Sequence, residues 1–358
     1  MKMKSKSLFL VFLMAFVLVL SACAPKAAAP VEEPAAEEPA EAPAVEPAME
    51  EKPVFASVVK SIGDTWFVRY EEGVLQFGED YGVESFMEGP SQPDSAAQVA
   101  IIEDLIAQGV DVIVNIPYGV PENEVAQKKA MAEGIVVIGH EAETAAGDSL
   151  QYDLEGFEVC AAGEEEMRDL AAFMGEEGQY AQFVGSLTNA SHNIWTDCGK
   201  AYQEANYPNM EWVGKFESKE NAENGYNMMK DLLRTNPAIK GIQSTDSAEI
   251  IGIGRAIDEA GLQDQIMAIG TCIVGDVGDF LQSGAVDMCM IWDPKDAAYA
   301  ALVLGQMILN GEEIKAGIDL KAPGYESITI RDGANGAKVI VGAAWAKITK
   351  DNMDEMNF

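Results

Sequence analysis

Residues 83–140 read VESFMEGPSQPDSAAQVAIIEDLIAQGVDVIVNIPYGVPENEVAQKKAMAEGIVVIGH. Three short runs of apolar and β-branched residues alternate here with two amphipathic stretches; the runs lie at 83–87, 111–116 and 135–139, and the stretches at 94–108 and 122–133. Short strands that alternate with helices predict right-handed β-α-β crossovers and a parallel sheet. This stretch therefore predicts a doubly wound α/β fold.

The same alternation continues on both sides of this stretch. A strand at 54–59 and a helix at 65–81 precede it, and further strands are expected at 181–186, 211–216, 239–244, 265–270 and 286–292. We predict two doubly wound, Rossmann-like parallel-sheet lobes joined by a three-crossing hinge, with crossings at 142–154, near 293–294 and at 317–327. The N-terminal lobe would comprise 53–147 with 294–320, and the C-terminal lobe 148–293 with 321–358.

The N-terminus predicts export. Lys2, Lys4 and Lys6 precede an apolar run at 8–20 that is too short to span a bilayer comfortably but fits the core of a signal peptide. The run ends in LSAC at 20–23, which resembles a bacterial lipobox. We expect removal of residues 1–22, a lipid on Cys23 and a membrane-anchored location outside the cytoplasm, in the periplasm or at the cell surface. An ordinary cleavage site with an incidental cysteine is the alternative.

The amino-acid composition predicts an N-terminal tether followed by a folded body. Residues 24–52 are nearly all Ala, Pro and Glu without an aromatic residue, which predicts a disordered, extended tether over 23–52. The remaining 53–358 are long enough for two domains. The whole chain has 59 acidic and 24 basic residues, which argues against nucleic acid or anionic lipid as a partner.

Four cysteines lie in the body, at Cys160, Cys198, Cys272 and Cys289. None forms a C-x-x-C pair, so we expect no zinc site. An exported protein can form disulfides, but the spacing does not decide the pairing. We expect no cofactor.

Polar and aromatic residues follow most of the predicted strands. Ligands of open α/β sheets bind outside the carboxyl ends of the strands, and pockets favour domain interfaces. Carboxylates and an ammonium can satisfy vicinal hydroxyls, while indole and phenyl rings stack on the apolar face of a sugar. Each aromatic taken alone fits core packing equally well. The predicted ligand-binding residues are Lys60, Trp66, Phe67, Glu141, Ser191, His192, Thr245, Asp246, Ser247, Trp292 and Asp293.

The histidines and glycines give no catalytic or metal motif. His140 and His192 both follow strands, and we prefer hydrogen bonding to a ligand over a structural, metal or acid–base role. H-E-x-x-H fails because position 144 is Thr, and Gly252-Ile253-Gly254 lacks the third glycine of a dinucleotide fingerprint. No G-x-S-x-G elbow or P-loop is present. We therefore predict no catalytic residue and no metal.

Six segments carry a resemblance to a known family: KSIGDTWF at 60–67, 88–114 with its GP-x-x-P-x-x-x-x-Q element, 128–143, 290–311, DLKAPGYESITI at 319–330 and ITKDNMDEMNF at 348–358. Together they resemble the sugar-binding proteins of ABC importers with the type 1 periplasmic binding fold, in the branch of autoinducer-2 and rhamnose receptors.

The resemblance implies a pocket that is only partly shared with that branch. The family's lysine matches Lys60, and its Trp-Asp pair matches Trp292-Asp293. Its T-W-D-S-D element falls on His140, Glu141 and Glu143, its Asp-Gln pair on Ser191-His192, and its Pro-x-Ala contacts on Thr245 and Ser247. The lost Asp-Gln pair weakens the case for autoinducer-2, and an aldose, deoxysugar or polyol is at least as well supported.

The sequence thus predicts a monomeric, lipid-anchored binding protein that delivers a small sugar, deoxysugar or polyol to an ABC permease. An autoinducer-2 type quorum-signal receptor is the first alternative. A lipoprotein enzyme with Glu141 and Glu143 as an acid–base pair is the second, but their i, i+2 spacing in an extended segment points the side chains apart.

Overall fold

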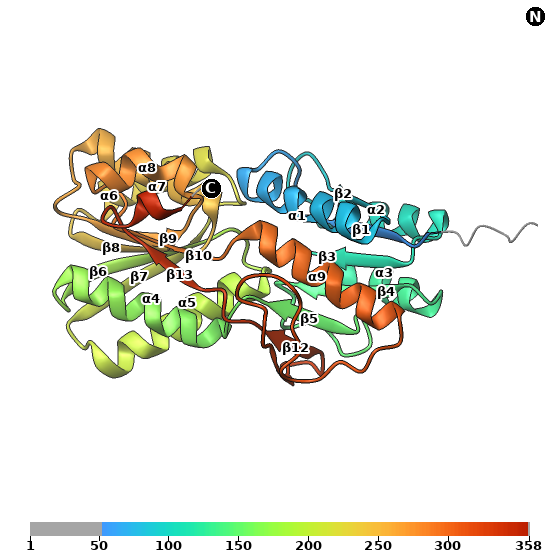
Figure 1. The fold of residues 1–358 in the computed structure, drawn as a ribbon. Coiled ribbons are helices and arrows are strands. Elements are labelled where there is room, and N and C mark those ends of the chain that lie inside the picture. Colours follow the sequence, from blue (N-terminus) through green and yellow to red (C-terminus); the bar gives the residue numbers. More distant parts are fainter. Residues whose placement is uncertain (1–51, 357–358) are drawn as a thin grey trace, which may run out of the picture. The chain divides into compact units, whose positions relative to one another are not determined.

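The computed structural model describes residues 52–356 (Figure 1). The predicted leader, the lipidated Cys23 and the tether up to residue 51 lie outside the described residues and stay predictions. None of the described helices is both long and apolar enough to cross a membrane.

The first sheet has seven strands among the described residues, and all neighbours pair in parallel except β11 and β12. Its order is β11-β12-β5-β4-β3-β1-β2, from β1 (Val54–Val58), β2 (Glu84–Glu88), β3 (Val112–Asn115), β4 (Val136–His140), β5 (Tyr152–Glu155), β11 (Thr329–Asp332) and β12 (Lys338–Val341). The helices of this first lobe are α1 (Thr65–Tyr81), α2 (Ser95–Gln108), α3 (Val120–Ala132) and α9 (Pro294–Leu309).

The second sheet repeats the design with six described strands in the order β13-β10-β9-β8-β6-β7, of which only the β10–β13 pair is antiparallel. Its strands are β6 (Gly178–Val184), β7 (Met210–Glu217), β8 (Ile239–Ser244), β9 (Met267–Thr271), β10 (Met288–Ile291) and β13 (Ala346–Ile348). The second lobe also holds α4 (Val159–Met174), α5 (Ala190–Asn206), α6 (Ala222–Thr235), α7 (Ser247–Ala260) and α8 (Val274–Ser283), and the 3-10 turn η1 (Met353–Glu355) follows β13.

Both faces of the first sheet are buried, which is why its strands read as continuous apolar runs. Phe55 belongs to a core cluster with residues of α1 and α9, whereas the next residue, Ala56, belongs to a cluster with residues of α2 and α3. Val136 and Val137 divide in the same way. The predicted α/β class with two doubly wound lobes is therefore confirmed.

Aspartates and glycines set the helix ends. Asp94 caps α2, since its carboxylate accepts hydrogen bonds from the N–H groups of Ala96 and Ala97. Gly109 ends the same helix at φ 75°, a left-handed conformation that glycine adopts without a Cβ clash. Asp64, Asp246 and Asp293 cap α1, α7 and α9 in the same way, which fixes where these carboxyl groups lie.

The chain passes between the two sheets three times, as predicted, but at different places. The crossings are 156–158, 292–293 and 342–345. Only the middle one agrees with the sequence prediction; the first comes after the expected 142–154, and the third after the expected 317–327.

Strands β5, β11 and β12 belong to the first sheet, so the predicted assignment of 148–293 and 321–358 to the second lobe is wrong for these strands. Strand β5 was not recognised as a strand in the sequence, because it reads YDLE and carries two carboxyl groups. Both Asp153 and Glu155 are nevertheless buried, and the Asp153 carboxyl accepts a hydrogen bond from the N–H of Ala142.

Two disulfides answer the pairing question that the spacing left open. Cys160 of α4 is bonded to Cys198 of α5, and Cys272 is bonded to Cys289 of β10, with Cα–Cα distances of 5.4 and 5.5 Å.

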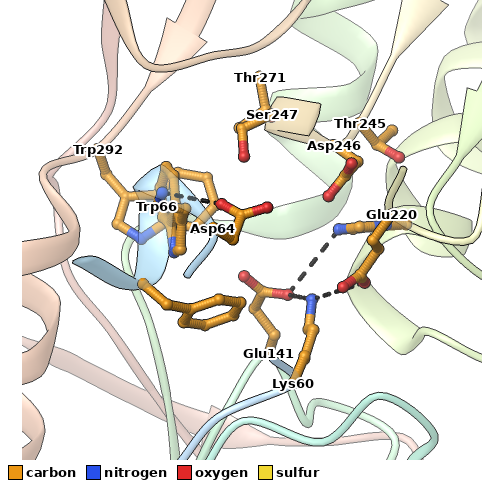
Figure 2. A pocket seen from close by; sticks show the side chains of 12 residues that line it. Lys60, Asp64, Trp66, Glu141, Glu220, Thr245, Asp246, Ser247, Thr271 and Trp292 are labelled. Atoms are coloured by element: carbon orange, nitrogen blue, oxygen red, sulfur yellow. Dashed lines mark hydrogen bonds and ion pairs between the residues drawn. The ribbon is translucent and has the colours of Figure 1, made fainter. Parts of the chain in front are cut away.

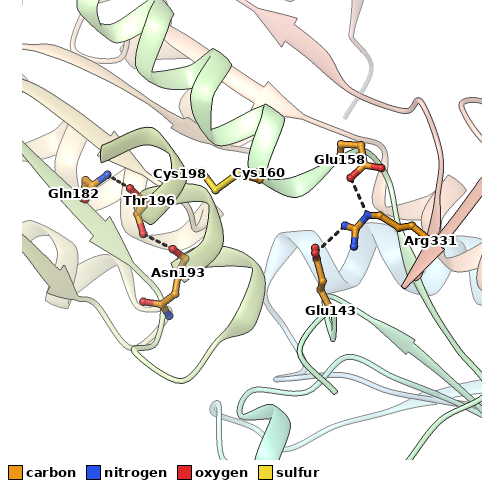
Figure 3. The surroundings of a disulfide bond; sticks show 8 residues. All are labelled: Glu143, Glu158, Cys160, Gln182, Asn193, Thr196, Cys198 and Arg331. Atoms are coloured by element: carbon orange, nitrogen blue, oxygen red, sulfur yellow. Dashed lines mark hydrogen bonds and ion pairs between the residues drawn. A yellow bond between two sulfur atoms is a disulfide. The ribbon is translucent and has the colours of Figure 1, made fainter. Parts of the chain in front are cut away.

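Figure 3 shows the first disulfide and, in the same region, Arg331. The Arg331 guanidinium binds the carboxylates of Glu143 at 2.7 Å and Glu158 at 2.9 Å. This ion-pair network ties the first crossing to the first lobe.

Candidate functional site

Side chains of both lobes and of the middle crossing enclose a cavity (Figure 2). The free volume among them is only about 20 Å³, which is room for about one water molecule, so the lobes must separate before anything larger can enter. It is lined by Lys60, Asp64, Trp66, Phe67 and Glu141 of the first lobe, His192, Glu220, Thr245, Asp246, Ser247 and Thr271 of the second, and Trp292 of the crossing.

Most lining residues lie just after a strand. Glu141 directly follows β4, Thr245 and Asp246 follow β8, and Thr271 is the last residue of β9. Parallel strands bring their carboxyl ends to one edge of a sheet, where open α/β folds bind ligands. Side chains distant in the sequence therefore converge in one cavity.

Lys60 joins the two lobes. Its Nζ lies 2.6 Å from Glu141 Oε2 in the first lobe and 3.2 Å from Glu220 Oε1 in the second. All three side chains are almost fully buried. Because an unpaired buried charge is costly, this ion-pair triad favours the arrangement in which the lobes meet.

Both carboxylates of the triad sit on left-handed backbone. Glu141 has φ 58° and Glu220 has φ 51°. That conformation costs a non-glycine residue roughly 1–2 kcal/mol, and such strain concentrates at functional sites. The ion pairs with Lys60 offset this cost and hold the two carboxylates against the cavity.

The three members of the triad have very different pKa values. Burial alone would raise the pKa of Glu141, but the Lys60 ammonium and the two histidines hold it at about 2. Burial raises the pKa of Glu220 to about 7, against the opposing effect of Lys60 and with the help of the Glu141 charge. Burial would lower the pKa of Lys60, yet the two carboxylates raise it well above its usual range. Glu141 and Lys60 are thus charged at neutral pH, whereas Glu220 holds its proton more readily than Glu141 does.

His192 is a neutral hydrogen-bond donor toward the cavity. Burial and the Lys60 ammonium lower the pKa of its imidazole to about 3. The N–H of Gly185 donates to Nδ1 at 3.2 Å, which leaves the single ring proton on Nε2. That nitrogen lies 3.9 Å from Glu141 Oε2. It can donate to a ligand oxygen placed between the two residues.

Asp64 and Asp246 each have one oxygen engaged and one available. Asp64 Oδ1 accepts from the N–H of Trp66, and Asp246 Oδ1 accepts from the N–H groups of Ala248 and Glu249. Figure 2 shows both carboxyl groups turned toward the cavity. Burial raises the pKa of both, and Glu220 and Asp64 raise that of Asp246 further.

Aromatic rings form one wall of the cavity. Trp66 and Trp292 meet edge to face with ring centroids 4.5 Å apart, and Phe67 lies beside them in the lining. The indole N–H of Trp292 and the hydroxyl of Thr271 are buried without a hydrogen-bond partner. The wall thus offers apolar faces, and two buried polar atoms beside them lack a hydrogen-bond partner.

Nine of the eleven residues predicted from the sequence line the cavity. Ser191 and Asp293 do not line it. The Ser191 hydroxyl donates to Glu155 at 3.3 Å, within the buried region behind the cavity. Asp293 caps α9 and forms two hydrogen bonds with Arg69, at 2.9 and 2.7 Å. Ser191 and Asp293 thus stabilise the structure around the crossings.

Three lining residues were not predicted as ligand contacts. Asp64 caps α1 and lines the cavity as well. Thr271 ends β9 without a distinctive motif. Glu220 lies three residues beyond β7, in a turn where Lys219 and Glu220 both have positive φ although neither is glycine. No local pattern marks such a residue.

Two further polar residues considered in the sequence, His140 and Glu143, lie outside the cavity lining. His140 Nδ1 lies 2.5 Å from the carbonyl oxygen of Leu154 and the ring is fully buried, so this histidine is structural. Glu143 binds Arg331 and does not line the cavity, so no Glu141–Glu143 acid–base pair forms. Within residues 52–356, no three His, Cys, Asp or Glu side chains are grouped as a metal site.

Comparison with known proteins agrees with this architecture. Residues 55–313 match the family model described as a periplasmic binding protein domain. The D-ribose/D-allose-binding protein of Pseudomonas aeruginosa is 23% identical over 245 residues, which cover 66% of this chain and 76% of that protein.

Two solved structures share the fold. An ABC transporter solute-binding protein from Clostridium phytofermentas with bound L-rhamnose has a TM-score of 0.79 at 20% identity, over 85% of this chain and 98% of that one. LsrB from Clostridium saccharobutylicum in complex with AI-2 has a TM-score of 0.78 at 19% identity, over 85% of this chain and all of that one. The chain belongs to the periplasmic binding protein family, as the sequence segments predicted.

Proposed function

We propose that this chain is the extracytoplasmic solute-binding protein of an ABC importer and that its cavity encloses a small sugar, deoxysugar or polyol. The observation that carries the proposal is the composition of the cavity wall. Charged and hydroxyl side chains of both lobes meet beside a wall of aromatic rings, which matches a ligand with several hydroxyls and an apolar face.

The proposed cycle uses hinge bending. The Lys60–Glu220 pair spans the lobes, so a ligand can enter only when the lobes separate. After entry, closure places donors and acceptors of both lobes on the same ligand, and the closed form would be recognised by the permease. The chain acts in this cycle as a monomer and catalyses no reaction.

Lipid anchoring is part of the proposal. A diacylated Cys23 followed by an extended tether would keep the body near the permease. Expression of the full chain in a bacterium with the lipoprotein-processing enzymes should give a membrane-bound protein. The Cys23→Ser variant should appear in the soluble fraction; equal membrane retention of both would contradict the anchor.

A thermal-shift screen tests the binding function. Monosaccharides, deoxysugars, polyols and autoinducer-2 are added singly, and hits are measured by titration calorimetry. A ligand that binds only the folded state raises the melting temperature, by an amount that grows with its concentration relative to Kd. We expect at least one sugar or polyol to do so and the Glu141→Ala variant to lose the effect. No shift with any sugar or polyol would contradict the proposal.

A quorum-signal receptor is the second candidate, because LsrB with AI-2 shares the fold. A shift with autoinducer-2 alone would favour it. A shift with sugars or polyols alone would favour import.

A further inference from the structure

More acidic than basic side chains line the cavity. Its lining contains four carboxyl groups, those of Asp64, Glu141, Glu220 and Asp246, and a single ammonium group, that of Lys60. Two of the four carboxylates already pair with this ammonium, at 2.6 and 3.2 Å. Neither histidine can add a positive charge near neutral pH, because burial lowers the pKa of both rings.

Asp64 and Asp246 therefore form no direct ion pair in the lining, although the Lys60 ammonium acts on both at longer range and opposes the rise of their pKa. Hydrogen bonds from helix N–H groups satisfy one oxygen of each, and the other oxygen faces the cavity. Asp246 also lies close enough to Glu220 and Asp64 for their charges to raise its pKa. Burying like charges together is unfavourable unless protons or a cation neutralise them.

A second observation points to a ligand at this cluster. The Thr271 hydroxyl and the Trp292 indole N–H line the same cavity, belong to side chains that are each 3% exposed, and have no hydrogen-bond partner. Buried polar atoms without partners are rare in folded proteins. These two side chains line the same cavity as Asp64 and Asp246.

We infer that the ligand of this cavity is a monosaccharide-sized polyol that carries an amino group in its ammonium form, such as an amino sugar. This inference rests on the proposed function and narrows its ligand class. The ammonium would bind the free oxygens of Asp246 and Asp64, and the hydroxyls would bind His192, Thr271 and the Lys60 triad. The Trp66 and Trp292 rings suit both a sugar face and a nearby cation.

The same charges define what the cavity rejects. A uronic acid or sugar phosphate would add a negative charge to a cluster with unpaired carboxyl groups. A neutral sugar would leave Asp246 and Asp64 to be neutralised by protons. Discrimination between an amine and a hydroxyl at one ring position therefore comes from charge rather than shape.

Matched sugar pairs test the inference by titration calorimetry. The probes are glucosamine with glucose, galactosamine with galactose, mannosamine with mannose, and glucuronate as the anionic member. We expect at least one amino sugar to bind tenfold or more tightly than its parent, and glucuronate not to bind. The preference should shrink as salt rises. Repeating the titration in buffers of different ionisation enthalpy should show proton release, because the ammonium displaces protons held by Asp246 and Glu220.

Asp246→Asn is the diagnostic variant, since asparagine also caps helices and removes only the charge. The ratio of amino-sugar to parent affinity should fall at least tenfold. Asp94→Asn is the matched control, because Asp94 caps α2 with the same hydrogen bonds but is remote from the lining. That variant should leave the ratio unchanged.

The outcomes separate the two proposals. Parent sugars that bind as well as their amino forms would overturn the inference and leave the sugar-binding function intact. A shift in melting temperature by calcium chloride alone, lost in Asp246→Asn, would overturn it in favour of a metal. Failure of all neutral sugars, polyols and amino sugars would overturn the proposed function as well.

Discussion

The ligand cavity and the hinge behind it share Trp292 but are built on opposite principles. Each crossing contributes one aromatic residue to the hinge, namely Phe157, Trp292 and Trp345. Phe157 lies 4.1 Å from Trp345 and 5.1 Å from Trp292 between ring centroids, and Trp195 of α5 packs against all three. The cavity consists mostly of charged and hydroxyl side chains, and the Thr271 hydroxyl among them has no hydrogen-bond partner.

This difference indicates that the hinge contributes mainly to the stability of the fold and the cavity mainly to ligand binding. Aromatic packing tolerates small rotations without leaving charges unpaired, which suits the segments that bend. The cavity depends on charges that are only partly compensated until a ligand arrives. Substitutions in the hinge should therefore change mainly the free energy of unfolding, and substitutions at the free carboxyl groups mainly ligand affinity.

The largest effect is expected in the hinge. Phe157→Ala should lower the free energy of unfolding by about 3–5 kcal/mol, the usual cost of removing a buried phenyl ring. Urea unfolding monitored by circular dichroism measures it. Phe173→Ala is the control, because Phe173 is an exposed phenylalanine of the nearby helix α4, and it should change stability by less than about 0.5 kcal/mol. Equal losses in both variants would refute the packing role of the crossings.

Lys60→Met tests the one place where the cavity itself stabilises the fold. Removing the ammonium leaves Glu141 and Glu220 buried without a partner, and we expect a loss of about 3 kcal/mol in the free energy of unfolding. The double variant Lys60→Met, Glu141→Gln should recover part of it. Lys315→Met, at an exposed lysine, serves as the control. A single variant as stable as the control would show that the triad contributes nothing.

A smaller effect on binding is expected at the carboxylates that face the ligand. Glu141→Ala and Asp246→Ala should each weaken the binding of the sugar found by the screen by about 1–3 kcal/mol, because ligand hydroxyls or an amine lose a partner. Glu143→Ala changes a carboxylate of the same loop that binds Arg331 and does not line the cavity. The Glu143→Ala variant should bind the sugar with the affinity of the unmodified chain. If calorimetry gave an unchanged affinity in all three variants, Glu141 and Asp246 would not belong to the binding site.

The smallest effect concerns buried acids of the second lobe outside both regions. Burial raises the pKa of Glu166 and of Glu249 to about 8 each. An acid whose folded-state pKa is raised makes the folded protein hold more protons than the unfolded chain, so this contribution is full below about pH 4.5 and is lost as pH rises through about 8. The melting temperature should fall by a few degrees between pH 6 and pH 8.5. Glu166→Gln should flatten that slope, and an unchanged slope would contradict the assignment.

The sequence predicted the cavity better than the lobe boundaries because the two depend on different signals. Lys60, Glu141 and Asp246 follow apolar strands, and strand ends converge in any doubly wound sheet. Strand β5 carries buried carboxyl groups that imitate a loop, and β12 joins the first sheet from the far end of the chain. Glu220 has no local signature, since its place depends on a left-handed turn and on Lys60 across the cleft.

A crystal structure of the chain with the panel sugar that gives the largest thermal shift tests the central claim most directly. We predict one sugar in the cavity, with polar contacts to Lys60, Glu141 or Asp64 on one side and to Asp246 or His192 on the other, and a ring face on Trp66 or Trp292. A sugar bound to a single lobe away from these residues would contradict the account.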